Sequence, residues 1–136
     1  MNDFMLHPQL EKDTLLVCDL PLSQVRLMND ARFPWLVMIP RREGLTELVD
    51  LSLEDEAQLW KEVRQVCEVL QTVFAADKLN VAALGNQVPQ LHLHVIARYR
   101  EDAAWPNPIW GSGPMQPYDA GNLELRLKTL AQALAQ

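Results

Sequence analysis

The chain has 136 residues, of which 49% are hydrophobic, so it can bury one core but is too short for two ordinary domains, and we expect a single domain over residues 1–136. Its net charge of -6 disfavours binding to a nucleic-acid backbone, although a small anionic substrate needs only local positive potential. The apolar runs last only about a strand length and the N-terminus shows no secretion signal, which predicts a soluble cytoplasmic protein that does not enter a membrane.

Three apolar-rich runs near the start of the chain predict strands over Leu15–Leu20, Gln24–Asn29 and Phe33–Ile39. Pro21, Leu22 and Ser23 form the turn between the first two runs, and Pro40 closes the third. Because the connections are short, antiparallel pairing is favoured over parallel crossovers.

A long amphipathic helix is predicted next, starting at Ser52, whose hydroxyl can accept a hydrogen bond from an unpaired backbone N–H group. Apolar residues then recur at helical spacing at Leu59, Val63, Val66, Leu70 and Val73, with Trp60, Cys67 and Phe74 widening the stripe. We expect this stripe, including Trp60 and Phe74, to pack on the sheet as core.

Two further strands are predicted over Leu79–Leu84 and Gln90–Arg98, separated by the loop Gly85–Pro89. The last strand alternates: Leu91, Leu93, Val95 and Ala97 face one way, and Gln90, His92, His94 and Arg98 face the other. The alternation predicts an aliphatic core face and a polar face.

The end of the chain is irregular and then helical. Residues 101–118 are rich in Pro, Trp, Gly and Asn, which is typical of an ordered irregular segment or of a flexible tail. A C-terminal amphipathic helix follows, with Leu123, Leu127, Leu130 and Leu134 on one face. The sequence therefore predicts an α+β fold with a core over about residues 15–98, and an irregular segment and helix over 99–136.

His92 and His94 are two of only three histidines and share one face of the predicted strand. They could be solvated, or they could bind zinc with a carboxylate recruited from elsewhere, since no third His or Cys is near in sequence. They could also act on phosphorus, because an imidazole with a pKa of about 6.5 offers a nucleophilic nitrogen near pH 7. Cys18 and Cys67 lie in apolar segments without metal-ligand spacing and are expected to be buried free thiols.

The run from Gln90 to Ile96, Gln-Leu-His-Leu-His-Val-Ile, resembles the histidine triad motif, His-φ-His-φ-His-φ-φ with φ apolar, at six of seven positions. The resemblance extends to Leu27-Met-Asn29, to the strand Phe33–Pro40 and to the Gly85–Pro89 loop, with the Trp- and Pro-rich tail similar to small bacterial members. The resemblance implies a five-stranded antiparallel sheet with helices and a homodimer with a continuous sheet.

The same resemblance assigns roles to residues. His92 would attack the α-phosphate and carry a covalent nucleotidyl group, and His94 would contact phosphate oxygens. The backbone carbonyl of Gln90 would orient His92. Asn29 would bind the ribose, and Asn86 and Gln87 would contact the phosphate. The implied substrate is a purine nucleotide or nucleoside phosphate, such as a dinucleoside polyphosphate or a phosphoramidate, with no metal and no cofactor.

Two positions depart from the family pattern. Gln90 stands where the first histidine is expected, and Trp35 stands where many members carry another histidine. A nucleotide-binding or sensing protein with weak or no catalysis is therefore the alternative hypothesis.

Overall fold

In a computed structural model, which describes residues 3–135, the molecule is built on one five-stranded antiparallel sheet in the order β1-β2-β3-β5-β4. The strands are β1 (Thr14–Asp19), β2 (Ser23–Met28), β3 (Trp35–Pro40), β4 (Lys78–Ala82) and β5 (Leu93–Arg98). Together with the helices below, this sheet confirms the predicted α+β fold.

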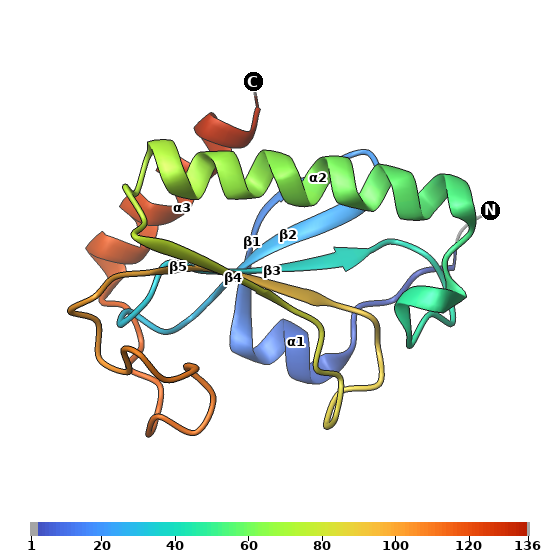
Figure 1. The fold of residues 1–136 in the computed structure, drawn as a ribbon. Helices are drawn as coiled ribbons and strands as arrows, with labels where there is room; N and C mark the ends of the chain where they lie inside the picture. The colour runs from blue at the N-terminus through green and yellow to red at the C-terminus, as the bar shows by residue number, and fades with distance from the viewer. Residues whose placement is uncertain (1–2, 136) are drawn as a thin grey trace.

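One face of the sheet is covered by α2 (Leu53–Thr72) and α3 (Ala120–Leu134), as Figure 1 shows. Each helix begins at a predicted or recognisable cap: the Ser52 hydroxyl accepts from the Asp55 N–H, and the Asp119 carboxylate accepts from the Asn122 N–H. Leu59, Val66 and Leu70 of α2 are fully buried against the sheet. Within residues 3–135, no helix combines the length and apolar character needed to cross a membrane.

Two residues of the predicted core stripe are not in the core. Trp60, on the outer surface of α2, is 45% exposed, and Val73, at its C-terminal end, is 44% exposed, whereas Phe74 packs against the core as expected. A buried carboxylate supplements the packing: Glu62, 1% exposed, accepts hydrogen bonds from the N–H groups of Leu22 and Ser23 at 2.7 and 2.8 Å. Glu62 thus fixes the β1–β2 turn to α2.

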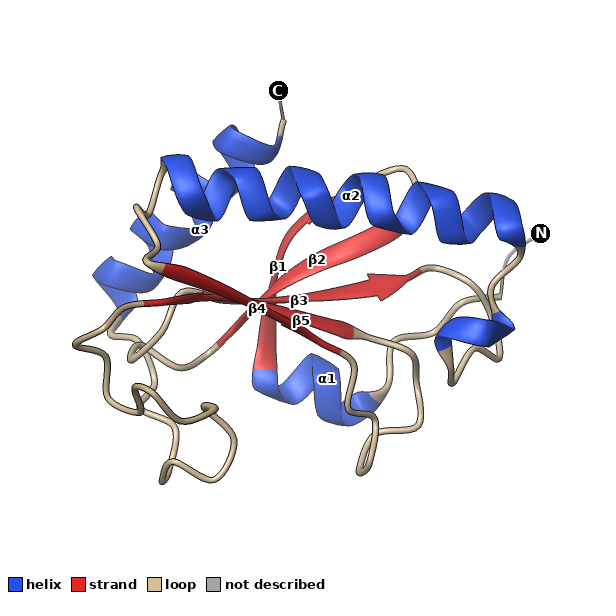
Figure 2. Ribbon diagram, in the orientation of Figure 1, coloured by secondary structure: helices blue, strands red, loops and turns tan. Residues whose placement is uncertain are grey.

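The opposite face of the sheet is also covered, which the sequence did not predict. A short helix, α1 (Pro8–Asp13), lies there with the loop after β4 and the segment after β5 (Figures 1 and 2). A single-turn 3-10 helix, η1 (Leu48–Asp50), precedes α2. A second apolar cluster lies between the sheet on one side and α1 and the segment after β5 on the other. It is made of Leu10, Met28, Phe33, Trp35, Val37, Ile39, Ile96, Ala104 and Ile109.

The strand that carries the histidines is shorter than predicted. β5 begins at Leu93, so Gln90, Leu91 and His92 lie just before it. The alternation itself is confirmed, since Leu91, Leu93, Val95 and Ala97 all enter the core under α2 and α3. The prediction of a polar opposite face is wrong in one respect: Ile96 shares it, and His92, His94 and Arg98 are buried there.

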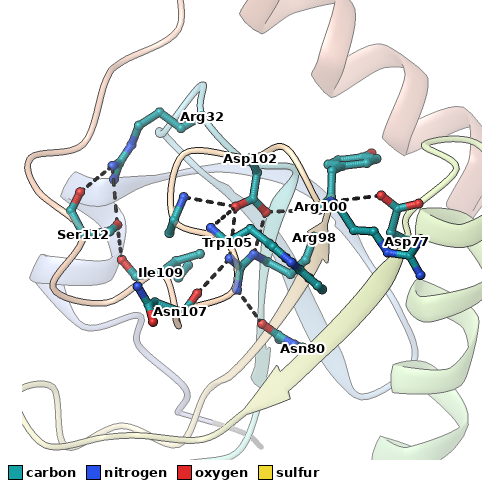
Figure 3. A network of polar contacts seen from close by, with 12 residues as sticks. Arg32, Asp77, Asn80, Arg98, Arg100, Asp102, Trp105, Asn107, Ile109 and Ser112 are labelled. Carbon is teal, nitrogen blue, oxygen red and sulfur yellow. Dashed lines mark hydrogen bonds and ion pairs between the residues drawn. The ribbon is translucent and has the colours of Figure 1, made fainter.

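Residues 99–118 form no helix or strand but are tied to the sheet by a polar network around Arg98 (Figure 3). The Arg98 guanidinium donates to both carboxylate oxygens of Asp102 at 2.8 and 3.1 Å, to the Asn80 side chain at 2.9 Å and to the Asn107 carbonyl at 2.8 Å. Nearby, Arg32 pairs with Asp30 and donates to the Ser112 carbonyl. The ordered irregular segment is therefore the correct alternative for this stretch.

Candidate active site

The proposed nucleophile has one ring nitrogen fixed by the backbone. His92 Nδ1 lies 2.6 Å from the carbonyl oxygen of Gln90. A carbonyl oxygen only accepts hydrogen bonds, so Nδ1 carries the proton and Nε2 of the neutral ring keeps its lone pair. Because the bond uses the main chain of residue 90, glutamine provides it as well as histidine would.

The second histidine is held in the opposite tautomer by Trp35. The indole Nε1–H of Trp35 donates to His94 Nδ1 at 3.0 Å. An indole N–H is a donor only, so Nδ1 accepts and the His94 proton sits on Nε2. Burial, together with the neighbouring charge of His92, lowers the pKa of His94 to about 4. Near neutral pH, His94 is therefore an uncharged hydrogen-bond donor.

Aromatic rings pack around this pair. The His92 and His94 rings lie 5.0 Å apart, and Trp110 approaches His94 edge-on at 5.2 Å between ring centroids. Trp110 also meets Trp35 edge-on at 6.2 Å. Since Trp110 belongs to the irregular segment after β5, the network around Arg98 holds one wall of the site in place.

A pocket of about 740 Å³ opens beside both histidines. It is lined by His7, Gln9, Leu10, Asp13, Met28, Trp35, Leu84, Gly85, Asn86, Gln87, Val88, His92, His94, Trp110 and Met115. Gly85, at the start of the loop Gly85–Pro89, has a φ of +66°, a backbone conformation that favours glycine. The structure thus brings His92, His94, Asn86 and Gln87 together, and the two amide side chains are exposed to a ligand.

Two predicted site residues have side chains engaged elsewhere. The side-chain oxygen of Asn29 accepts from the Tyr118 N–H at 3.0 Å, and Asn29 does not line the pocket. The Gln90 carboxamide turns to the N-terminal segment, where it accepts from the His7 N–H and donates to the Met5 carbonyl, both at 2.8 Å. The ribose contact of Asn29 stays a prediction.

His7 as a pocket residue and Trp35 as the partner of His94 were not predicted from the sequence. No local pattern could reveal them, because the hydrogen bond to Gln90 spans 83 residues and that to His94 spans 59. In residues 3–135, no three His, Cys, Asp or Glu side chains gather as a metal site would require. Cys18 and Cys67 are free and half-buried, and burial raises the pKa of both thiols.

Comparison with known proteins gives the family. The model of the HIT domain matches residues 9–101. The chain belongs to the HIT family. Two solved relatives are a histidine triad protein from Bradyrhizobium japonicum, at 44% identity and a TM-score of 0.94 over 96% of this chain and 98% of that one, and one from Marinobacter aquaeolei VT8, at 42% identity and 0.95 over 98% and 97%.

Curated enzymes match this HIT chain more distantly. The bis(5'-adenosyl)-triphosphatase of Saccharomyces cerevisiae is 29% identical over 70 residues, which are 48% of this chain and 34% of the enzyme. The asymmetrical bis(5'-nucleosyl)-tetraphosphatase of Schizosaccharomyces pombe is 32% identical over 72 residues, 49% of this chain and 39% of the enzyme. The match therefore spans little more than a third of either relative.

Proposed function

We propose that this HIT protein hydrolyses or transfers the nucleotidyl group of a nucleoside phosphate, through a covalent intermediate on His92. The observation that carries the proposal is the hydrogen bond between His92 Nδ1 and the Gln90 carbonyl, which leaves Nε2 as the nucleophilic nitrogen. The pocket beside His92 is large enough for a nucleotide.

In the first step, the Nε2 lone pair of His92 forms a bond to the α-phosphorus while the bond from phosphorus to the leaving group breaks. The leaving group departs with the electron pair of that bond. The nucleotidyl-imidazole carries a positive charge, and its Nδ1–H donates to the Gln90 carbonyl, which stabilises that charge.

His94 supports this step as a neutral donor. Its Nε2–H donates to a non-bridging phosphate oxygen, where negative charge develops in the transition state. Because its pKa is about 4, His94 does not act as an imidazolium acid at neutral pH.

In the second step, a water or another acceptor attacks phosphorus, the Nε2–phosphorus bond breaks, and its electron pair returns to His92. For hydrolysis, the hydroxyl of water ends on the nucleotide and its proton on the leaving group or solvent. The net reaction consumes one water and restores the enzyme.

The pocket and the distant relatives support the proposed substrate class. In this proposal Asn86 and Gln87, which line the pocket from the exposed loop, contact the phosphates. The names of the two curated relatives favour dinucleoside polyphosphates, and nucleoside phosphoramidates fit the same chemistry. In this proposal a purine nucleotide occupies the pocket, and Asn29 binds the ribose after a rearrangement of its bond to Tyr118.

The covalent intermediate is the decisive test. We expect intact-mass spectrometry after acid-free quenching with diadenosine triphosphate to show one adenylyl group on the wild-type protein and none on His92→Ala. His94→Gln is the matched variant, because it removes a neighbouring imidazole and leaves the nucleophile in place. Equal labelling of wild type and His92→Ala would refute the assignment of His92.

A nucleotide-binding or sensing protein is the second candidate. It is favoured by the use of Gln90 to hold the N-terminal segment and by the presence of Trp35, since both positions lack the imidazole expected from the family pattern. It predicts AMP or GMP binding by calorimetry without turnover of any polyphosphate or phosphoramidate. Turnover that vanishes in His92→Ala would exclude it.

We also propose a homodimer with a continuous sheet. β4 ends the sheet on one side, and its Val81 is 40% exposed, whereas α3 packs against β1 at the other side. An open edge strand presents unpaired backbone groups to a second copy. Light scattering should give twice the monomer mass for wild type and the monomer mass for Val81→Lys, and a monomeric wild type would contradict the dimer.

A further inference from the structure

All three histidines of the chain line the same pocket. His92 and His94 belong to the strand region of the family motif, but His7 comes from the segment before α1. Position 90, where the family pattern expects an imidazole, is occupied by a glutamine whose side chain is hydrogen-bonded to the backbone of His7. The glutamine that stands in place of the expected imidazole is therefore in direct contact with the segment that carries His7.

The N-terminal segment is fixed against the site at several points. The Gln90 carboxamide accepts from the His7 N–H and donates to the Met5 carbonyl, each at 2.8 Å. Leu10 is buried in the second apolar cluster, and Phe4 and Leu6 pack against it. The position of His7 is thus set by both polar and apolar contacts.

The His7 ring presents a donor. Its Nδ1 accepts from the Gln9 N–H at 3.0 Å, so the neutral ring carries its proton on Nε2. The residues described as lining the pocket include the carboxylate of Asp13 but no Lys or Arg side chain. The donors available to a phosphate in this pocket are therefore uncharged N–H groups of imidazole, amide, indole and backbone, and His7 supplies one of the imidazoles.

We propose that His7 is a substrate-binding residue that donates from Nε2 to a phosphate oxygen, and that Gln90 is the positioning residue that holds it there. This inference rests on the proposed function. According to this proposal, His7 of the N-terminal segment supplies the imidazole that is missing from position 90, and the Gln90 side chain holds His7 in position.

Imidazole NMR tests the contact without using turnover. Three histidines give three sets of ring signals, which single substitutions assign. On titration of the wild-type protein with AMP, we expect the His7, His92 and His94 signals to shift along one saturation curve. If His92 and His94 respond and His7 does not, His7 is only the cap of α1 and the inference is wrong while the proposed function stands. If none responds, the proposed function is wrong as well.

Kinetics and a positioning variant complete the test. His7→Ala should raise the KM for diadenosine triphosphate about tenfold with kcat nearly unchanged, as expected for the loss of a hydrogen bond to a charged group. In Gln90→Ala, the His7 signal should lose its response to AMP while the His92 and His94 signals keep theirs. Glu11→Gln is the control, because Glu11 is exposed on α1 and does not line the pocket. A His7 response that survives in Gln90→Ala would overturn the positioning role of Gln90.

Discussion

The two histidines His92 and His94 differ in which ring nitrogen bears the proton. The Gln90 carbonyl holds the His92 proton on Nδ1, and the Trp35 indole holds the His94 proton on Nε2. The same side chain therefore leaves a free lone pair on Nε2 at position 92 and presents an N–H donor from Nε2 at position 94. Tryptophan suits this task because, unlike histidine, it cannot reverse the direction of the hydrogen bond.

Replacing Trp35 tests this directional bond. In Trp35→Phe the ring volume is largely kept and the donor is lost, so protonation of His94 Nδ1 no longer costs a hydrogen bond. We expect the pKa of His94, about 4 in the wild type, to rise by about 0.5 to 1 unit, measured by NMR titration of the His94 ring. Trp60→Phe, on the outer surface of α2, is the control. An unchanged His94 titration in Trp35→Phe would show that the indole hydrogen bond does not contribute to the lowered pKa, leaving burial and the charge of His92 as its causes.

At the scale of elements, the histidine strand shows what periodicity can and cannot predict. Alternation continues through Gln90, Leu91 and His92, although pairing with β3 ends at Leu93 and pairing with β4 ends at His94. Side chains of an extended chain point alternately to opposite sides whether or not the chain pairs with another strand. The sequence therefore predicts which way each side chain points but not where the strand begins. Similarly, α1 has six residues, too few to show a helical period.

A buried ion pair connects β5 to the irregular segment that follows it. Arg98 and Asp102 side chains are 2% and 3% exposed. Removing the carboxylate in Asp102→Ala leaves a buried guanidinium without its counter-ion, which should lower the free energy of unfolding by about 3 to 5 kcal/mol. The comparison is Glu68→Ala, which breaks the exposed Arg64–Glu68 pair and should cost less than about 1 kcal/mol in urea unfolding. Equal losses in the two variants would contradict a structural role for the Arg98 network.

At the scale of the whole molecule, the sheet is a middle layer with apolar clusters on both sides. The core under α2 and α3 follows from the strand alternation and the helical stripe of α2, so the fold could be predicted from sequence. The second layer is assembled from α1, the loop after β4 and the segment after β5, and its contacts join residues far apart in sequence. The resemblance of the sequence to a family motif pointed to His92, His94, Asn86 and Gln87, whereas no local pattern could place His7 in the same pocket.

Burial of His94 makes the stability of the whole protein depend on pH. Between pH 6.5 and about 4 the unfolded chain binds a proton at His94 that the folded protein does not, so stability falls as the pH is lowered through this range. The expected loss is about 3 kcal/mol, measured by urea unfolding at pH 7 and pH 4. Between the same two pH values, the free energy of unfolding of His94→Gln should fall by about 3 kcal/mol less than that of the wild type. An equal pH dependence in wild type and His94→Gln would count against a depressed His94 pKa.

A second acid-sensitive group acts at lower pH. Burial by itself would raise the pKa of Asp102, but hydrogen bonds from Arg98 and from the Tyr99 and Ala104 N–H groups together lower it to about 2. The stability contributed by this carboxylate is therefore lost only as the pH falls from 3.8 to about 2.

The match to the HIT domain ends at residue 101, one position before Asp102, whereas Trp110 and Met115 of the pocket wall come after it. The residues that the family model covers therefore include His92, His94, Asn86 and Gln87, whereas part of the pocket wall comes from residues beyond that match. Arg98 of β5 joins these two stretches, because its guanidinium binds Asp102 and the Asn107 carbonyl beyond the boundary. A change in the segment after β5 would therefore alter the pocket wall without replacing either histidine.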